Sequence, residues 1–223
     1  MATRYYQLVS ALPPVPYFRR AGRLPMSRRR LEHRLGMLET SDRRDLRSSE
    51  ALIRWSQQPV NRTTAELASM YRKVVNGLES RSLKSVMTNR MNMRTVLVAL
   101  RLRRRKSGPP EHLWGLGPYV RTIESRWAEP GFGLEAVFPW IGAAAGFLER
   151  GDAMELEGLL MDESWKMLSR VAERAPFGFE DVFAFVFKLD ILTRWLSYDA
   201  EAASRRFEQL IMEVTSDHQQ LFT

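Results

Sequence analysis

The chain of 223 residues contains no cysteine, so disulfide bonds, thiolate zinc sites and a cysteine nucleophile are all excluded. Histidine is nearly as scarce. The three histidines, His33, His112 and His218, are so widely separated in the sequence that no two of them have the spacing of metal ligands. We therefore expect no metal centre in this protein.

A phosphate-binding loop of the Walker or dinucleotide type is also missing. The nearest match, Gly115-x-Gly117, is followed by Pro118 rather than by a helix that carries Gly-Lys. We therefore expect neither a nucleotide nor another cofactor. Because no constellation of catalytic side chains stands out either, an enzyme is the least favoured class of function.

Long hydrophobic runs are absent as well. No stretch reaches the roughly 18–20 consecutive apolar residues of a membrane span. Tyr5, Tyr6 and Gln7 interrupt the apolar patch that a signal peptide would need near the N-terminus. With 44% hydrophobic and 27% charged residues, the composition is typical of a globular chain. We expect a soluble, cytoplasmic protein.

The charge is distributed unevenly, although the net value is only +8. Residues 1–106 contain 24 Lys and Arg against 7 Asp and Glu, a net charge of +17, whereas residues 107–223 contain 10 against 19, a net charge of −9. We interpret 1–106 as a basic helical unit and 107–223 as an acidic helical unit, which can also pack as one continuous domain. Fields of this size attract an acidic partner or an anionic surface.

Apolar residues recur at helical spacing along most of the chain and no convincing alternating strand is found, which predicts an all-α fold. Helices are expected to begin at the capping residues Ser27, Ser41, Thr63 or Thr64, and Asp152. The two most apolar helices are expected over about 85–105 and 180–197. Further helices are expected over 119–128, over 134–148 with an interruption at Pro139, and from Asp199 onwards, while residues 5–11 form either a short strand or an extended lead-in.

The segment from Arg90 to Gly108 combines the longest apolar run of the N-terminal half with its densest positive charge. Its apolar side chains cover most of the helix circumference, so other elements must surround it. It ends in a cluster that we call the basic foot, where the helix dipole favours cations: Arg101, Arg103, Arg104, Arg105 and Lys106. Gly108 is expected to provide the left-handed cap after the last turn.

A second basic cluster, Arg28, Arg29 and Arg30, lies on the polar face of an amphipathic helix. Together with the basic foot, these residues are the candidate partner-binding residues. Like charges this close repel one another and require compensation. For the basic foot two sources remain open: a partner, or the helix dipole together with acidic residues of the C-terminal half, of which the candidates are Glu155, Glu157, Asp162 and Glu163.

Two stretches share a pattern in which a long apolar helix carries Asn or Asp together with Arg: MNMRTVLVALR over 91–101 and FKLDILTRW over 187–195. This pattern resembles the repeated helical unit of the C subunit of archaeal and bacterial V/A-type rotary ATPases, which is named the d subunit in eukaryotes. The opening YYQLVSALP over 5–13, with Leu192, Trp195 and Phe207, is more similar to a shorter bacterial family of unknown function whose genes lie beside V-type ATPase genes. A full-length C subunit has three such units, and this chain has room for about two.

The resemblance implies an elongated bundle of two helical units, each similar to the repeated unit of the C subunit, that has no catalytic role. It would connect the central shaft of the ATPase to the membrane rotor ring, and so couple proton or sodium transport to ATP synthesis or hydrolysis. The expected partners are the central-stalk subunits and the rotor ring, with no small-molecule substrate. The protein would then be peripheral, at the cytoplasmic face of the membrane.

The alternative is a helical nucleic-acid-binding protein whose basic N-terminal half neutralises phosphates. Against this alternative, the two basic clusters lack the interleaved aromatic residues on which bases stack. No helix-turn-helix pattern stands out either.

Overall fold

The computed structural model describes residues 4–54, 62–110 and 113–198, and every regular element within them is helical, which confirms the all-α prediction. The N-terminal half contains α1 (Tyr6–Ser10), the 3-10 turn η1 (Phe18–Arg20), α2 (Arg28–Leu35), α3 (Thr40–Ile53), α4 (Thr64–Gly77) and α5 (Arg81–Arg104). The C-terminal half contains α6 (Val120–Ser125), the 3-10 segment η3 (Pro130–Gly133), α7 (Ile141–Arg150), α8 (Ala153–Arg174) and a helix over 179–198. The helix predicted from Asp199 lies outside the described residues.

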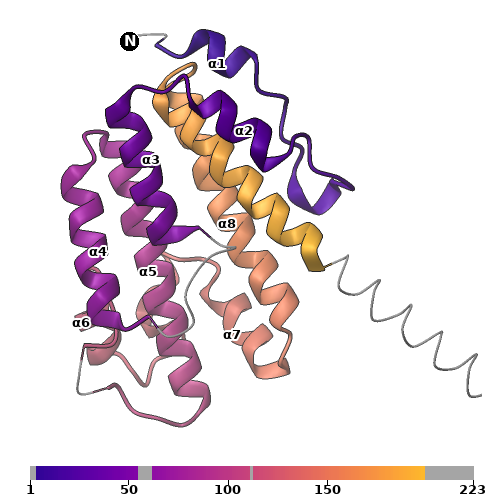
Figure 1. Ribbon diagram of the computed structural model, residues 1–223. Coiled ribbons are helices and arrows are strands. Elements are labelled where there is room, and N and C mark those ends of the chain that lie inside the picture. The colour runs from indigo at the N-terminus through magenta and orange to yellow at the C-terminus, as the bar shows by residue number, and fades with distance from the viewer. Residues whose placement is uncertain (1–3, 55–61, 111–112, 199–223) are drawn as a thin grey trace, which may run out of the picture.

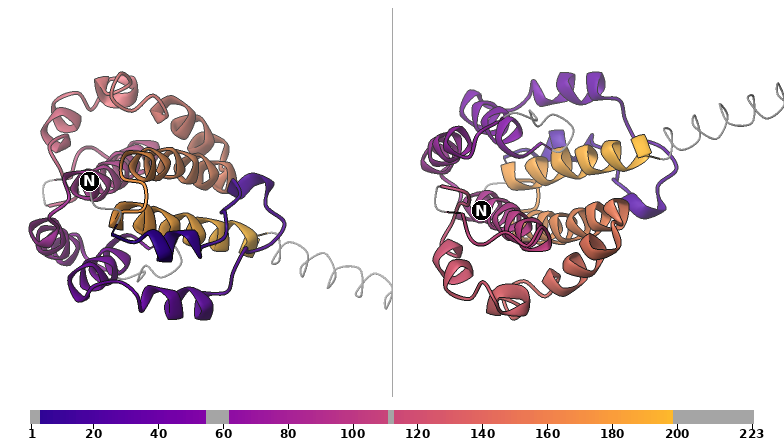
Figure 2. Two further views of the ribbon diagram at one scale, coloured as in Figure 1. Left: turned by 90° about the horizontal axis from the view of Figure 1, so that it is seen from above. Right: turned by 90° about the horizontal axis from the view of Figure 1, so that it is seen from below.

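The helices surround a centre made by α5, α8 and the 179–198 helix (Figure 1). Seen from above and below, α8 and the 179–198 helix lie side by side, with α2, α3 and α4 on one side and the segment that carries α6 and α7 on the other (Figure 2). Helix α5 contacts α3, α4, α6, α7 and α8. The prediction that the apolar helix around residues 85–105 is surrounded by other elements is therefore confirmed.

Two hydrophobic clusters form the core, and α5 passes through both. The first joins the N-terminal helices and the start of α5, as far as Met91, to the later part of α8 and the 179–198 helix. The second joins α5 from Met93 onwards to α6, α7 and the beginning of α8. Both clusters draw residues from each side of the charge boundary at 106/107, so the charge boundary is not a packing boundary.

Several helix starts follow the local rules read from the sequence. Ser27 caps α2 by accepting a bond from Arg30 N, and Asp152 caps α8 by accepting a bond from Glu155 N. Thr63 and Glu66 form the complete reciprocal capping box of α4. Helix α3 starts at Thr40 rather than after Ser41, and its N-cap Glu39 makes no side-chain capping bond.

Two elements differ from the predictions. Residues 6–10 form helix α1 rather than a strand or an extended lead-in. Tertiary bonds hold it, since Tyr5 N donates to Phe177 O at 2.9 Å and Tyr5 Oη donates to Asp42 at 2.5 Å. Residues 134–140 are turns, and α7 begins only at Ile141, because Pro139 disfavours helical geometry in the residue before it.

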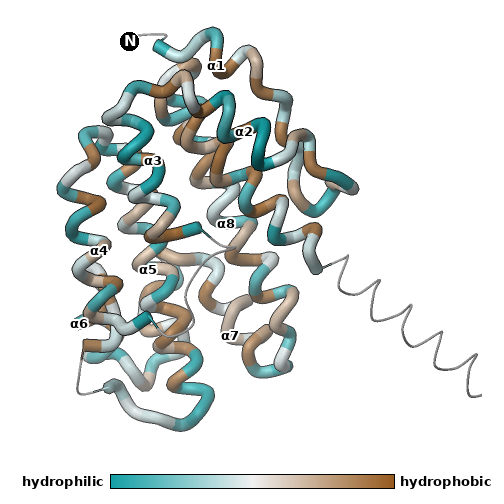
Figure 3. The backbone as a smooth tube through the Cα atoms, viewed as in Figure 1, coloured by the Kyte–Doolittle hydropathy of each residue, from teal (hydrophilic) through white to brown (hydrophobic). Residues whose placement is uncertain are grey.

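Hydrophobic and polar faces are separated along most helices (Figure 3). Helix α2 is mostly hydrophilic and buries only Leu31 and Leu35. None of the helices in the described ranges combines the length and the hydropathy that crossing a bilayer requires.

Candidate functional site

The first predicted basic cluster is divided in two by its environment. Arg28 is half-buried and forms ion pairs with Glu32 and, at 2.7 Å, with Glu50 of α3, so it holds α2 against α3. Arg29 and Arg30 are exposed and line a wide hollow of about 1040 Å³ beside residues 10–13. Only these last two arginines are placed to meet a partner.

The basic foot is divided in the same way. Arg103 Nη1 donates to Glu129 O at 2.6 Å, and its guanidinium lies 4.5 Å from the centroid of the Phe132 ring. Arg103 therefore attaches the end of α5 to η3. The other four members of the basic foot are exposed: Arg101, Arg104, Arg105 and Lys106.

The left-handed residue that closes α5 is Lys106, with φ of 57°, and not Gly108. Lys106 N donates to Arg103 O at 2.8 Å and Ser107 N donates to Leu102 O at 3.1 Å, which is the bond pattern of a Schellman cap. The bonds that close the last turn therefore offset the strain of a positive φ at a lysine.

One of the open interpretations was that acids of the C-terminal half compensate the basic foot, and for the four candidates on α8 it is wrong. Glu155 and Asp162 pair with Arg19 of η1, and Glu163 pairs with Lys166. Glu157 pairs with Arg194. Nor does the structure bring the two basic clusters together, since α2 and the C-terminal end of α5 lie toward opposite ends of the molecule (Figure 1).

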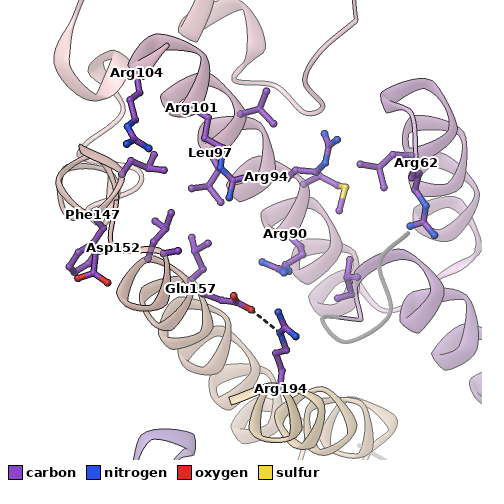
Figure 4. Close-up of a pocket in the computed structure, with 18 of the residues that line it drawn as sticks. Arg62, Arg90, Arg94, Leu97, Arg101, Arg104, Phe147, Asp152, Glu157 and Arg194 are labelled. Carbon is purple, nitrogen blue, oxygen red and sulfur yellow. Dashed lines mark hydrogen bonds and ion pairs between the residues drawn. The ribbon is translucent and has the colours of Figure 1, made fainter. Parts of the chain in front are cut away.

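A groove of about 610 Å³ runs along α5, and we call it the arginine groove. Six arginines, two carboxylates and a wall of aliphatic residues line it. Four of the arginines belong to one face of α5, and Arg62 and Arg194 are contributed by other segments (Figure 4): Arg90, Arg94, Arg101 and Arg104. Their spacings of four, seven and three residues keep them on a single helix face.

One end of the arginine groove is a network of paired charges. Arg194 Nε donates to Glu157 Oε1 at 3.2 Å, and the hydroxyl of Tyr198 donates to the other carboxylate oxygen. Burial and this bond to Glu157 raise the pKa of Tyr198 to about 12. Arg90 lies beside this network. Burial lowers the pKa of its guanidinium to about 9, against the opposing charges of Asp190 and Glu157.

Arg94, one turn further along α5, has a different environment. Its Nη1 atom is buried and has no hydrogen-bond partner in the described part of the chain. Burial lowers the pKa of Arg94, and no carboxylate of the described residues opposes this shift. The middle of the arginine groove therefore holds a partly desolvated cation without a partner among those residues, which is the kind of group that a ligand carboxylate or phosphate binds by paired charge-assisted bonds.

Sequence reasoning missed the arginine groove, although it identified Arg101 and Arg104 as members of the basic foot. Arg90 and Arg94 extend the same face toward the N-terminus of α5, and their spacing is visible in the sequence. The helix was interpreted as apolar on nearly all sides, and that average concealed one cationic face. The contributions of Arg62 and Arg194 depend on the tertiary fold, so the sequence held no signal for them.

One family model matches the chain over residues 49–218, which is well over half of its length, and its description is Protein of unknown function (DUF2764). No match was found among curated proteins or among solved structures. The matched range includes α5, α8 and the whole of the arginine groove. The chain therefore belongs to the DUF2764 family of proteins of unknown function.

Proposed function

We propose that this protein is a non-catalytic coupling subunit of a V/A-type rotary ATPase. In this role two helical units, each similar to the repeated unit of the C subunit, form an elongated body that connects the central shaft to the membrane rotor ring, at the cytoplasmic face of the membrane. The body transmits rotation between ATP synthesis or hydrolysis and the transport of protons or sodium ions.

The observation that carries the proposal is that each of the two helices that resemble the repeated unit buries one Asn or Asp and contributes one Arg to the arginine groove. Asn92 of α5 and Asp190 of the 179–198 helix are both buried, with 5% and 6% of their surfaces exposed. Arg94, two residues after Asn92, and Arg194, four residues after Asp190, both line the arginine groove. Two helices from opposite halves of the chain thus bury an Asn or Asp and present an Arg to the same space, as a repeated unit would.

A second observation concerns the mechanical requirement of a coupling part, which must transmit force without bending. Helix α5 is 24 residues long, or about 36 Å, and both core clusters pack against it. Arg103 attaches its C-terminal end to η3. Beyond this attachment, Arg105 and Lys106 are exposed at the tip, where an anionic surface of a partner can reach them.

The test is a charge reversal at this tip, Arg105→Glu with Lys106→Glu. Arg103 is left intact because its bonds are structural. A matched control, Arg72→Glu with Lys73→Glu, reverses one Arg and one Lys that are exposed on α4. We expect both variants to keep the helical circular dichroism of the wild type. We expect only the tip variant to lose co-purification with the rotor subunits from the cells that produce the protein.

Co-purification that survives the tip reversal rejects the docking role of the basic foot. A wild-type chain that brings down no component of a rotary ATPase rejects the proposed function as a whole. A gel-shift titration with duplex and single-stranded nucleic acid is run in parallel. Tight binding that weakens steeply with salt would favour the nucleic-acid alternative, since released counterions make such binding salt-dependent.

A further inference from the structure

The four arginines of α5 in the arginine groove form a long, straight row. Arg90 and Arg104 are 14 residues apart, which corresponds to about 21 Å along the helix axis. One phosphate or carboxylate can reach only one or two of these side chains. A ligand that uses the whole row must therefore be extended and must carry several anionic groups at intervals.

Among the residues that the structure describes, the lining of the arginine groove carries more positive than negative charge. Six arginines line it against two carboxylates. Glu157 is already bonded to Arg194 and Tyr198, and Asp152 accepts a bond from the Glu155 amide as the cap of α8. Among the residues that the structure describes, Arg94, Arg101 and Arg104 have no carboxylate partner. The site is thus cationic before any ligand arrives.

Burial makes this charge unfavourable, since a cation that loses water without gaining a partner destabilises the fold. The destabilisation is concentrated at Arg94, whose Nη1 atom is both buried and unbonded within the described residues. Arg101 and Arg104 are exposed and add positive charge at the open end. An incoming carboxylate would pair with Arg94 at a smaller further loss of hydration than at a fully hydrated arginine.

The remaining wall of the arginine groove is aliphatic and selects among polyanions. Among the described residues it is formed by side chains of α3, α4, α5, α7 and α8, with Phe147 as their single aromatic ring: Leu52, Ile53, Leu67, Leu97, Val98, Leu148, Leu156 and Leu160. Single-stranded nucleic acid is bound by stacking its bases on aromatic faces, whereas an amphipathic helix buries a row of leucine-like side chains in such a groove. Carboxylates at helical spacing on that same peptide would match the spacing of the arginines.

We propose that the arginine groove binds an acidic amphipathic helix of a partner protein, with its carboxylates on Arg94, Arg101 and Arg104 and its apolar side chains against the aliphatic wall. The proposal depends on the residues of this groove and not on the assignment to a rotary ATPase. It adds a second interaction surface, distinct from Arg105 and Lys106 at the tip of α5.

The experiment uses the full chain and a fluorescein-labelled synthetic helical peptide that carries leucines on one face and glutamates beside them. Fluorescence anisotropy should show saturable binding. The same peptide with every glutamate changed to glutamine should bind weakly or not at all. The variant Arg94→Gln with Arg101→Gln should raise the Kd about tenfold or more, because a single hydrogen bond to a charged group contributes roughly a tenfold factor.

The matched control is Arg105→Gln with Lys106→Gln, which removes the same charge outside the arginine groove and should change the Kd by less than about twofold. The exposed pair Arg101→Gln with Arg104→Gln repeats the test without touching a buried side chain. Because this control variant changes the tip of α5, it should bind the peptide normally even if it no longer assembles with rotor subunits. Failure of the proposed function and failure of this inference are thus distinguishable.

Three results would overturn the inference: no saturable binding of the peptide to the wild type, equal loss in the groove and tip variants, or preferential binding of another anion. For the last, inorganic phosphate, a single-stranded oligonucleotide and vesicles with anionic lipid are titrated as competitors. If the peptide binds weakly, and one of these competitors displaces it only when Arg94 and Arg101 are present, the arginine groove is assigned to that competitor instead.

Discussion

The sharpest prediction concerns two arginines whose replacement by methionine should change the free energy of unfolding in opposite directions. Arg94 is half-buried and its Nη1 atom has no bond within the described part of the chain, whereas Arg54 Nε donates at 3.0 Å to Asp190, whose side chain is 4% exposed. Methionine preserves much of the aliphatic stem at both positions, and at Arg94, inside α5, it has nearly the helix propensity of arginine. The substitutions therefore differ chiefly in what happens to the charge.

An unsatisfied buried donor costs about 1–3 kcal/mol. Because Arg94 is only partly buried, we take the lower end and expect Arg94→Met to raise the free energy of unfolding by about 1 kcal/mol. For a chain of 223 residues this corresponds to a Tm increase of about 2–4 °C. Arg54→Met removes a bond to a buried carboxylate, and the free energy of unfolding should fall by about 2 kcal/mol.

The assay is urea unfolding followed by circular dichroism, with calorimetry for Tm. The m-value should stay constant, so that a shift of the midpoint reports stability rather than a change in the exposed surface. A decrease for Arg94→Met as large as that for Arg54→Met would refute the reasoning. It would mean that the Arg94 guanidinium has an intramolecular partner and that the arginine groove is not built to receive an anion.

Two further predictions test other parts of the fold. Burial and the bond to Glu157 raise the pKa of Tyr198 from the usual 10.0 to about 12. The stability that this group contributes below pH 10 should therefore be lost as the pH rises from 10 to 12. In the variant Tyr198→Phe, the urea midpoint should decline less over this pH range. Gly117→Ala should lower the free energy of unfolding in urea by about 2 kcal/mol, because φ is 97° and the new Cβ would lie 2.2 Å from Asn92 Oδ1. The control Gly108→Ala, where the new Cβ meets no atom, should leave the free energy of unfolding nearly unchanged.

Much of the fold could be predicted because the interactions that determine it join residues close together in the sequence. The caps at Ser27, Thr63 and Asp152 involve residues at most three positions away, and the apolar periodicity of α5 and α8 is a local property of the sequence. Prediction failed where distant residues decide. Helix α1 has only five residues and depends on Phe177 and Asp42, more than 30 positions away. A helix this short does not form by propensity alone.

The candidate site was also predicted only in part from the sequence. The basic foot was recognised from its local charge density, but charge density does not reveal which cations are already used. Arg103 is bonded to η3 and Arg28 to α3, so the sequence overestimated the surface available to a partner. The arginine face of α5, by contrast, is visible in the sequence, because its arginines are spaced by four, seven and three residues. Examining each face of the helix, rather than its overall hydropathy, would have found it.

The charge of Arg94, which has no carboxylate partner among the residues that the structure describes, connects the stability of the fold with the proposed binding. Nearby carboxylates that could neutralise an arginine exist in this fold, but Glu157 is bonded to Arg194 and Tyr198, and Asp190 to Arg54. The chain thus pairs the charges at one end of the arginine groove and leaves its centre cationic, at a cost in stability that methionine would remove. A partly buried charge without a partner lowers stability in a sequence that is otherwise consistent with its fold. Such a group is typical of a binding site, because the ligand supplies the missing partner.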